Sequence, residues 1–168
     1  MRKRSLNFKL HPIDLELRGN SVLLVDDSIV RGNTSKKIVE MARKAGAKKV
    51  YFASASPPII GPDPYGIDLP TTTDLIAANH TIEEIRKMIG ADGLFYTTVK
   101  DLHNAVRVGN HKIKRFSDSC FTGKYPTPEV TPKLLKQLGS GRNLTRDEFE
   151  KSREEEESSE QYKMMALV

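Results

Sequence analysis

The segment SVLLVDDSIVRGNTS, residues 21–35, constrains the fold of this 168-residue chain more than any other feature. It opens with an uninterrupted apolar run at 22–25, which predicts a short strand covered on both faces of a parallel sheet. Small and polar residues follow, and a helical pattern then places one apolar face at Ile38, Met41, Ala42 and Ala45. Gly46 is typical of the residue that ends such a helix. A strand that leads directly into a helix indicates an α/β domain.

Two further strands are predicted at 50–55 and 94–96. Strand, helix and strand within about 35 residues form the βαβ unit of a parallel sheet. Capping-box spacing predicts three helix starts, at Thr71 with Asp74, Thr81 with Glu84, and Thr98 with Asp101. The middle helix has the apolar stripe Ile82, Ile85, Met88 and Ile89, and a further short helix is expected at 131–138. Three strands are too few for a free-standing doubly wound sheet, so the domain is expected to be incomplete.

Composition excludes several classes of protein. No apolar run reaches the about 18 residues that span a bilayer, and the N-terminus lacks the apolar stretch of a secretory signal. Cys120 is the single cysteine, so neither an internal disulfide nor a cysteine-built metal cluster is expected. The net charge of +5 comes from scattered basic residues, which does not indicate nucleic-acid binding. These features predict a cytoplasmic protein without a membrane or nucleic-acid partner.

The residues after the first strand suit a sugar phosphate. Gly32 allows close backbone approach, and a helix that begins directly afterwards offers free N–H groups and its positive dipole end to a phosphate. Asp26 and Asp27 repel phosphate, so they are expected to bind vicinal hydroxyls or Mg²⁺. Phosphate on one side with diol and metal on the other describes a 5-phosphoribosyl group.

The matching reaction is displacement at the anomeric carbon, with pyrophosphate leaving. Positive charge develops on the ring, and two fixed carboxylates can stabilise it while Mg²⁺ neutralises the leaving group. Two alternatives use the same residues. A receiver domain of response regulators also opens with a strand that ends in two acids, but GPDPYG before Asp68 cannot form the buried strand that a phosphoacceptor needs. The second alternative is a purely structural Asp-Asp turn.

VLLVDDSIVRG followed by hydroxyl residues resembles the phosphoribosylpyrophosphate motif of type I phosphoribosyltransferases. The SIVRG variant resembles the amidophosphoribosyltransferase family in particular. The likeness continues through MARKAGAKKVYFASASPPI, YGIDLPT, DLIA, EEIRKMIGADGL and CFTGKYPT, over about residues 1–130. The resemblance implies the C-terminal part of that family's chain, with the parallel-sheet type I phosphoribosyltransferase fold.

The resemblance also implies roles for individual residues. Asp26 and Asp27 would contact the ribose hydroxyls and Mg²⁺ as the catalytic pair. The 5-phosphate loop would comprise Ser28, Ile29, Val30, Arg31, Gly32, Asn33, Thr34 and Ser35. Arg4 and Lys9 would belong to a flexible loop that closes over the substrate. Asn33 replaces the usual threonine and can still donate a hydrogen bond. Only Cys120 remains where some relatives hold an iron–sulfur cluster, so none is expected.

The resemblance over about residues 1–130, together with the charged composition of the residues after it, predicts four regions. They are the end of the flexible basic loop at 1–20, the C-terminal part of a phosphoribosyltransferase domain at 21–111, an irregular extension at 112–140, and a charged, disordered tail at 141–168. The family's glutaminase domain, whose N-terminal cysteine releases ammonia from glutamine, has no counterpart in these residues. Phosphoribosylpyrophosphate, that glutaminase domain and further copies of the full-length chain are the expected partners. The rival interpretation is a regulatory module that binds phosphoribosylpyrophosphate without catalysis.

Overall fold

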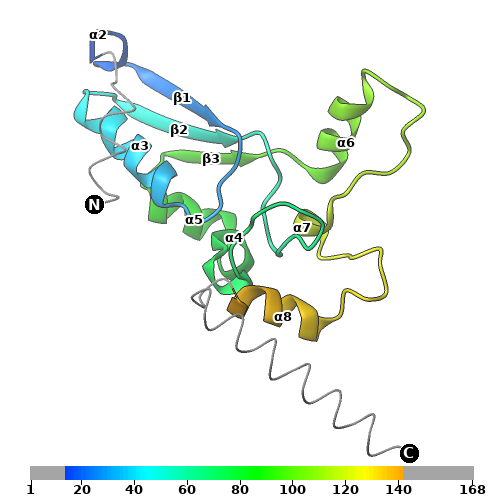
Figure 1. The fold of residues 1–168 in the computed structure, drawn as a ribbon. Helices are drawn as coiled ribbons and strands as arrows, with labels where there is room; N and C mark the ends of the chain where they lie inside the picture. Colours follow the sequence, from blue (N-terminus) through cyan, green and yellow to red (C-terminus); the bar gives the residue numbers. More distant parts are fainter. Residues whose placement is uncertain (1–13, 142–168) are drawn as a thin grey trace, which may run out of the picture.

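The computed structural model describes residues 14–141, which form a three-stranded parallel sheet with helices packed against it (Figure 1). The strands, in their order across the sheet, are β1 (Ser21–Asp26), β2 (Lys49–Ser54) and β3 (Gly93–Tyr96). The predicted α/β class and all three predicted strands are confirmed. The predictions for Arg4, Lys9, most of region 1–20 and nearly all of the tail lie outside the described residues.

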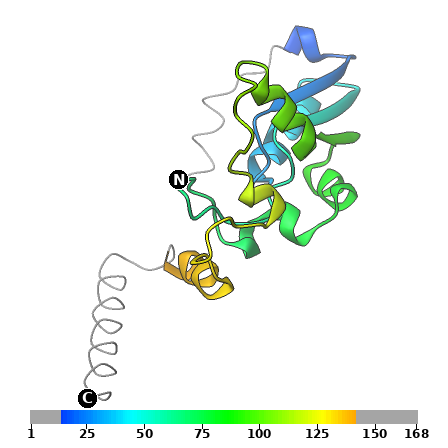
Figure 2. The same cartoon turned by 90° about the vertical axis from the view of Figure 1, so that its right-hand side faces the viewer.

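Eight helical segments precede, connect and follow the strands among the described residues. They are α2 (Asp14–Leu17), α3 (Asn33–Lys44), the 3-10 helix η1 (Thr72–Asp74), α4 (Ile76–Asn79), α5 (Ile82–Ile89), α6 (Val99–Arg107), α7 (Ser119–Thr122) and α8 (Pro132–Gly141). The two views place α2 and α8 at opposite ends of the described part (Figures 1 and 2). No helix in this part has the length and apolar content needed to cross a membrane.

Two of the three predicted helix starts are confirmed. Thr81 and Glu84 form a complete capping box at α5, and the Thr98 hydroxyl accepts a hydrogen bond from the Asp101 amide at α6. Such caps satisfy backbone donors that have no partner within the helix. The predicted capping box at Thr71 is wrong, because a single 3-10 turn follows it and no side chain caps that turn.

The main core lies between the sheet and one layer formed by α3 and α5. Its strand residues alternate in sequence, as a pleated strand requires, and they are Val22, Leu24, Val50, Phe52, Leu94 and Tyr96. From the helices, Val39, Ala42, Ile85 and Ile89 pack against them. The buried residues among these, together with Ile29, Ala47, Ile76 and Ala91, form the first cluster, and Val22, Leu24 and Tyr96 are partly buried against it.

The predicted apolar faces of both helices need correction. In α3 the buried residues are Ser35, Val39 and Ala42, whereas Ile38 and Met41 are half-buried at the flank. In α5 Ile82 and Met88 are 47% and 45% exposed. In α3 the buried residues are smaller than the half-buried ones, whereas in α5 two isoleucines four positions apart, Ile85 and Ile89, are buried and a third isoleucine is not. In α5 the position of a residue around the helix, and not its size, therefore decides whether it is buried.

The prediction that the first strand is covered on both faces is also wrong. Leu23 and Val25 are 58% and 69% exposed, and Phe95 on β3 is 56% exposed on the same face. Helices α3 and α5 both pack on the opposite face. The uninterrupted apolar run therefore predicted the strand correctly, but it did not predict which face of the strand is packed against helices.

A second cluster of buried residues lies away from the sheet. It consists of Ile59, Leu69, Leu75 and Cys120, with Val30, Ala78 and Phe121 packed against them. The Cys120 carbonyl accepts hydrogen bonds from Ile60 and Gly61 N–H at 2.8 and 3.1 Å. The second cluster thus joins the proline-rich segment after β2 to α7.

Candidate functional site

The β1–α3 loop, residues 27–32, lies at the carboxyl end of the sheet, where open α/β sheets bind their ligands. A cavity of about 460 Å³ opens there. It is lined by Asp26, Asp27, Ser28, Val30, Arg31, Gly32, Asn33, Thr34 and Ser35. Nine of the ten residues from 26 to 35 thus meet at one cavity. The other, Ile29, is 1% exposed and anchors the loop in the first cluster.

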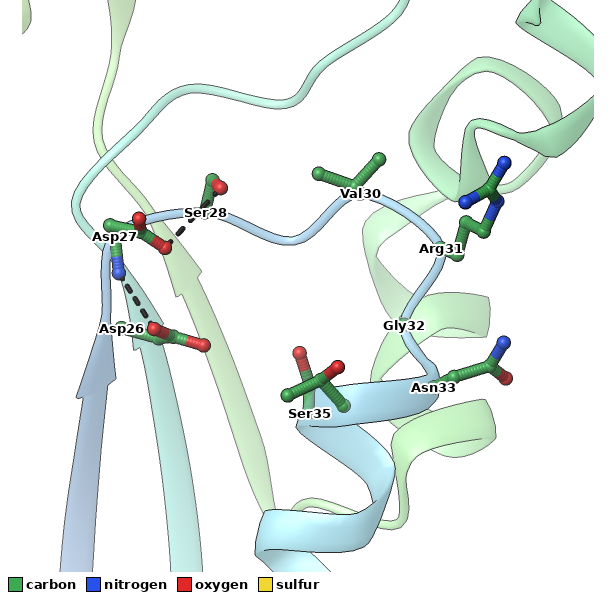
Figure 3. A pocket seen from close by; sticks show the side chains of 9 residues that line it. Asp26, Asp27, Ser28, Val30, Arg31, Gly32, Asn33 and Ser35 are labelled. Carbon is green, nitrogen blue, oxygen red and sulfur yellow. Dashed lines mark hydrogen bonds between the residues drawn. The ribbon is translucent and has the colours of Figure 1, made fainter. Parts of the chain in front are cut away.

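The two carboxylates lie on one side of this cavity (Figure 3). One oxygen of Asp26 accepts a hydrogen bond from the Asp27 amide at 3.0 Å, and the Ser28 hydroxyl lies 3.4 Å from Asp27 Oδ1. Both contacts lie between neighbouring residues, so they orient the carboxylates without neutralising their charge. The pair can accept hydrogen bonds from hydroxyl groups or bind a cation.

The N-terminus of α3 lies across the cavity from these carboxylates, where Ser35 is drawn (Figure 3). Gly32 caps the helix with φ 75°, and neither a side-chain cap nor an acidic residue is present in the first turn. The first amides of a helix have no partner within it, and together with the helix dipole they favour an anion. This side of the cavity therefore offers positive potential, and the Asp26–Asp27 side offers negative charge.

Gly32 is required at the junction for two reasons. Its φ of 75° lies in the left-handed region, which residues with a side chain rarely adopt. A Cβ at this position would also lie 2.7 Å from Ile76 Cδ1, closer than atoms tolerate. The loop therefore packs directly against α4 at this point.

The side chain of Arg31 does not point toward the carboxylates. It extends to the far side of the loop (Figure 3), where its Nη2 lies 2.9 Å from Asp74 Oδ2 in η1. Val30 contacts the second cluster, and its carbonyl accepts a hydrogen bond from the Ile76 amide at 2.9 Å. These contacts hold the loop from the side opposite the cavity.

Sequence reasoning missed Asp74 and Ile76 as neighbours of the loop. Asp74 was expected to cap a helix at Thr71, but its carboxylate pairs with Arg31, 43 positions earlier. Ile76 belongs to the segment DLIA, which carried only a family likeness. No local pattern in the sequence signals either contact, because both depend on the tertiary fold.

The carboxylates of Asp26 and Asp27 are of the ligand type that Mg²⁺ prefers. Among residues 14–141 no three His, Cys, Asp or Glu side chains gather as a ligand group. Mg²⁺ commonly takes one or two carboxylates and completes its shell with water and phosphate oxygens, which Asp26 and Asp27 can accommodate. Tyr96, the last residue of β3, lies at the same end of the sheet. Burial of its side chain raises the pKa of the phenol to about 12.

The parallel sheet and its two-sided cavity define an α/β protein in which a helix N-terminus faces a carboxylate pair. The chain is 51% identical to the amidophosphoribosyltransferase of Escherichia coli over 143 residues, which are 85% of this chain and 28% of that protein. It is 49% identical to the Pseudomonas aeruginosa amidophosphoribosyltransferase over 142 residues, or 84% and 28% of the two chains. The chain is therefore homologous to part of the amidophosphoribosyltransferases.

Solved structures agree with this relationship. The glutamine phosphoribosylpyrophosphate amidotransferase of B. subtilis, in complex with ADP and GMP, superposes with a TM-score of 0.64 at 40% identity, covering 80% of this chain and 31% of that one. A structure described as the allosteric regulatory enzyme of purine biosynthesis gives 0.65 at 41% identity, covering 76% and 28%. No protein-family model matches the chain. The chain spans about 28% of the length of the curated relatives.

Proposed function

We propose that this chain provides the ribose 5-phosphate and Mg²⁺ subsite of an amidophosphoribosyltransferase. The observation that carries the proposal is the cavity between the α3 N-terminus, which has no side-chain cap, and the Asp26–Asp27 pair. In this proposal residues 21–111 form the C-terminal part of the phosphoribosyltransferase domain, 112–140 an extension, and 141–168 a tail. The likeness to family members over more than four-fifths of the chain supports it.

In the proposed complex the two sides of the cavity bind different parts of phosphoribosylpyrophosphate. The 5-phosphate lies against the first turn of α3, with hydroxyls of Ser28, Thr34 and Ser35 as further donors. The 2- and 3-hydroxyls donate to Asp26 and Asp27. Arg31 contributes its backbone, because its side chain is paired with Asp74.

The parent reaction converts glutamine, phosphoribosylpyrophosphate and water to 5-phosphoribosylamine, glutamate and pyrophosphate, the first committed step of purine synthesis. At the anomeric carbon the bond to pyrophosphate oxygen breaks and a bond to ammonia nitrogen forms. Positive charge develops on the ring, and the fixed carboxylates of Asp26 and Asp27 stabilise it. Bound Mg²⁺ supplies charge neutralisation to pyrophosphate.

Glutamine hydrolysis is assigned to other parts of the full-length protein. The family's glutaminase uses an N-terminal cysteine, whereas the single cysteine here is buried, and burial raises the pKa of the Cys120 thiol. The purified 168 residues are expected to release no ammonia from glutamine. Detectable release, measured by an enzyme-coupled ammonia assay, would refute this assignment.

Calorimetric titration with phosphoribosylpyrophosphate and Mg²⁺ tests the subsite. Asp26→Asn and Asp27→Asn are each expected to weaken binding about tenfold or more, because each removes a charged hydrogen-bond acceptor. Glu40→Gln is the matched control, since this exposed carboxylate lies on α3 outside the cavity. If the parent chain binds and both Asp variants bind equally well, the roles of the two carboxylates are wrong. Binding without any turnover in the full-length protein would favour the regulatory module.

A further inference from the structure

We propose that Asp74 and Ile76 are positioning residues that hold the β1–α3 loop in the conformation that accepts a phosphate. The proposal rests on the function proposed above for this loop. Neither residue lines the 460 Å³ cavity. Both act from the opposite side of the loop, through Arg31, Val30 and Gly32.

The first contact is electrostatic. Arg31 Nη2 and Asp74 Oδ2 lie 2.9 Å apart, and the two side chains are 56% and 50% exposed. The pair fixes Arg31 on the outer side of the loop, as Figure 3 illustrates by the direction of its side chain. A free guanidinium beside the cavity could pair with Asp26 or Asp27 instead, and would then compete with ribose hydroxyls and Mg²⁺. The ion pair with Asp74 prevents this competition, because it holds the Arg31 guanidinium away from the two carboxylates.

The second contact is a backbone hydrogen bond. The Ile76 amide donates to the Val30 carbonyl at 2.9 Å. Ile76 is the first residue of α4, so its N–H has no acceptor within that helix. The loop supplies the acceptor, and the start of α4 in return sets the position of the peptide that precedes Arg31.

The third contact is steric. Ile76 Cδ1 occupies the space that a side chain at residue 32 would need, and the carbon lies 2.7 Å from the position of such a Cβ. Gly32 is the N-cap of α3, so displacement of Ile76 would let the helix start shift. Three different forces, from ion pair, hydrogen bond and packing, thus act on three consecutive residues of the loop.

Two measurements test the proposal on the full 168-residue chain. Isothermal titration with ribose 5-phosphate reports the affinity of the cavity, and amide hydrogen exchange of Ile76 reports its bond to Val30 without any ligand. Asp74→Asn is expected to weaken binding about two- to fivefold, the range of an exposed ion pair, and to accelerate Ile76 exchange. In an Arg31→Gln background the same change should have no further effect on affinity.

The chain offers matched controls. Glu83→Gln breaks the exposed Arg86–Glu83 pair of α5, and it should leave both readings unchanged. Ile76→Val deletes the Cδ1 that faces Gly32 and is expected to weaken binding, whereas Ile85→Val deletes an equivalent buried methyl elsewhere in the first cluster and is not. Ile85→Val thereby separates loop positioning from a general loss of stability.

The outcomes separate this proposal from the proposed function. If the parent chain does not bind ribose 5-phosphate, the proposed function fails, and unchanged Ile76 exchange in Asp74→Asn would independently overturn the positioning role. If the parent chain binds and Asp74→Asn binds equally well or more tightly, the positioning role is overturned while the proposed function stands.

Discussion

The two faces of the sheet carry similar apolar side chains in very different surroundings. On the covered face Val50 and Phe52 are fully buried against α3 and α5, whereas on the other face Leu23, Val25 and Phe95 are more than half exposed. Burial of apolar area stabilises a fold at roughly 25 cal/mol per Å², so the covered face provides most of this sheet's stability. An apolar sequence therefore identifies a strand, while only tertiary structure decides which of its faces is packed.

The register aligns the exposed side chains into a patch. Val25, Ala53 and Phe95 are neighbours across the three strands, and Leu23 lies beside Tyr51. Parallel sheets are normally covered on both faces. We therefore expect the purified chain to self-associate through this uncovered face.

The largest expected loss of folding stability results from a substitution on the covered face of the sheet. Phe52→Ala is expected to lower the free energy of unfolding by about 3–5 kcal/mol, because it leaves a cavity in the packed core. Phe95→Ala is the matched control on the other face and should cost less than about 1 kcal/mol. Urea unfolding followed by circular dichroism measures both. Equal losses would contradict the comparison of the two faces.

A smaller loss of folding stability is expected at Asp92, whose carboxylate links α3 to the sheet. Asp92 accepts hydrogen bonds from the Val50 amide at 2.7 Å and from Arg43 of α3 at 2.6 Å. The bond from Val50, assisted by Arg43, lowers the pKa of Asp92 below its ordinary 3.8. Asp92→Asn is expected to cost about 1 kcal/mol at neutral pH, a figure discounted for the side chain's exposure.

The sign of the pH dependence follows from that lowered pKa. The folded state binds a proton at Asp92 less readily than the unfolded state, so the stabilisation is complete well above pH 3.8 and is lost as pH falls through the folded pKa. Urea unfolding of the parent chain and Asp92→Asn should therefore converge at low pH. A difference that persisted unchanged into acid would disprove this origin.

The smallest effect on stability is expected on the uncovered face. Leu23→Thr combined with Val25→Thr should change the free energy of unfolding by no more than about 0.5 kcal/mol per residue, because both side chains already contact solvent. The same variant should shift the chain toward monomer in light scattering, since it removes apolar surface. If light scattering shows that the parent chain is already a monodisperse monomer, the expected self-association through this face is wrong.

Features that depend on neighbouring residues were predictable from the sequence. The three strands and the caps at Thr81 and Thr98 are local, and the cavity is built almost wholly from ten consecutive residues. The apolar faces of α3 and α5 were predicted incorrectly in part, because a stripe in the sequence does not show which of its members meet the packed layer. Asp74 and Ile76 could not be placed beside the loop, since their contacts join residues more than 40 positions apart.

The buried thiol of Cys120 can be used to measure local opening of the chain. Its side chain is 3% exposed within the second cluster, which also contacts Val30 of the β1–α3 loop. Because burial raises the pKa of the thiol and keeps reagents out, a thiol reagent is expected to label Cys120 only when the second cluster opens locally. The labelling rate therefore reports how often the second cluster opens beside the β1–α3 loop, and no engineered probe is required to measure it.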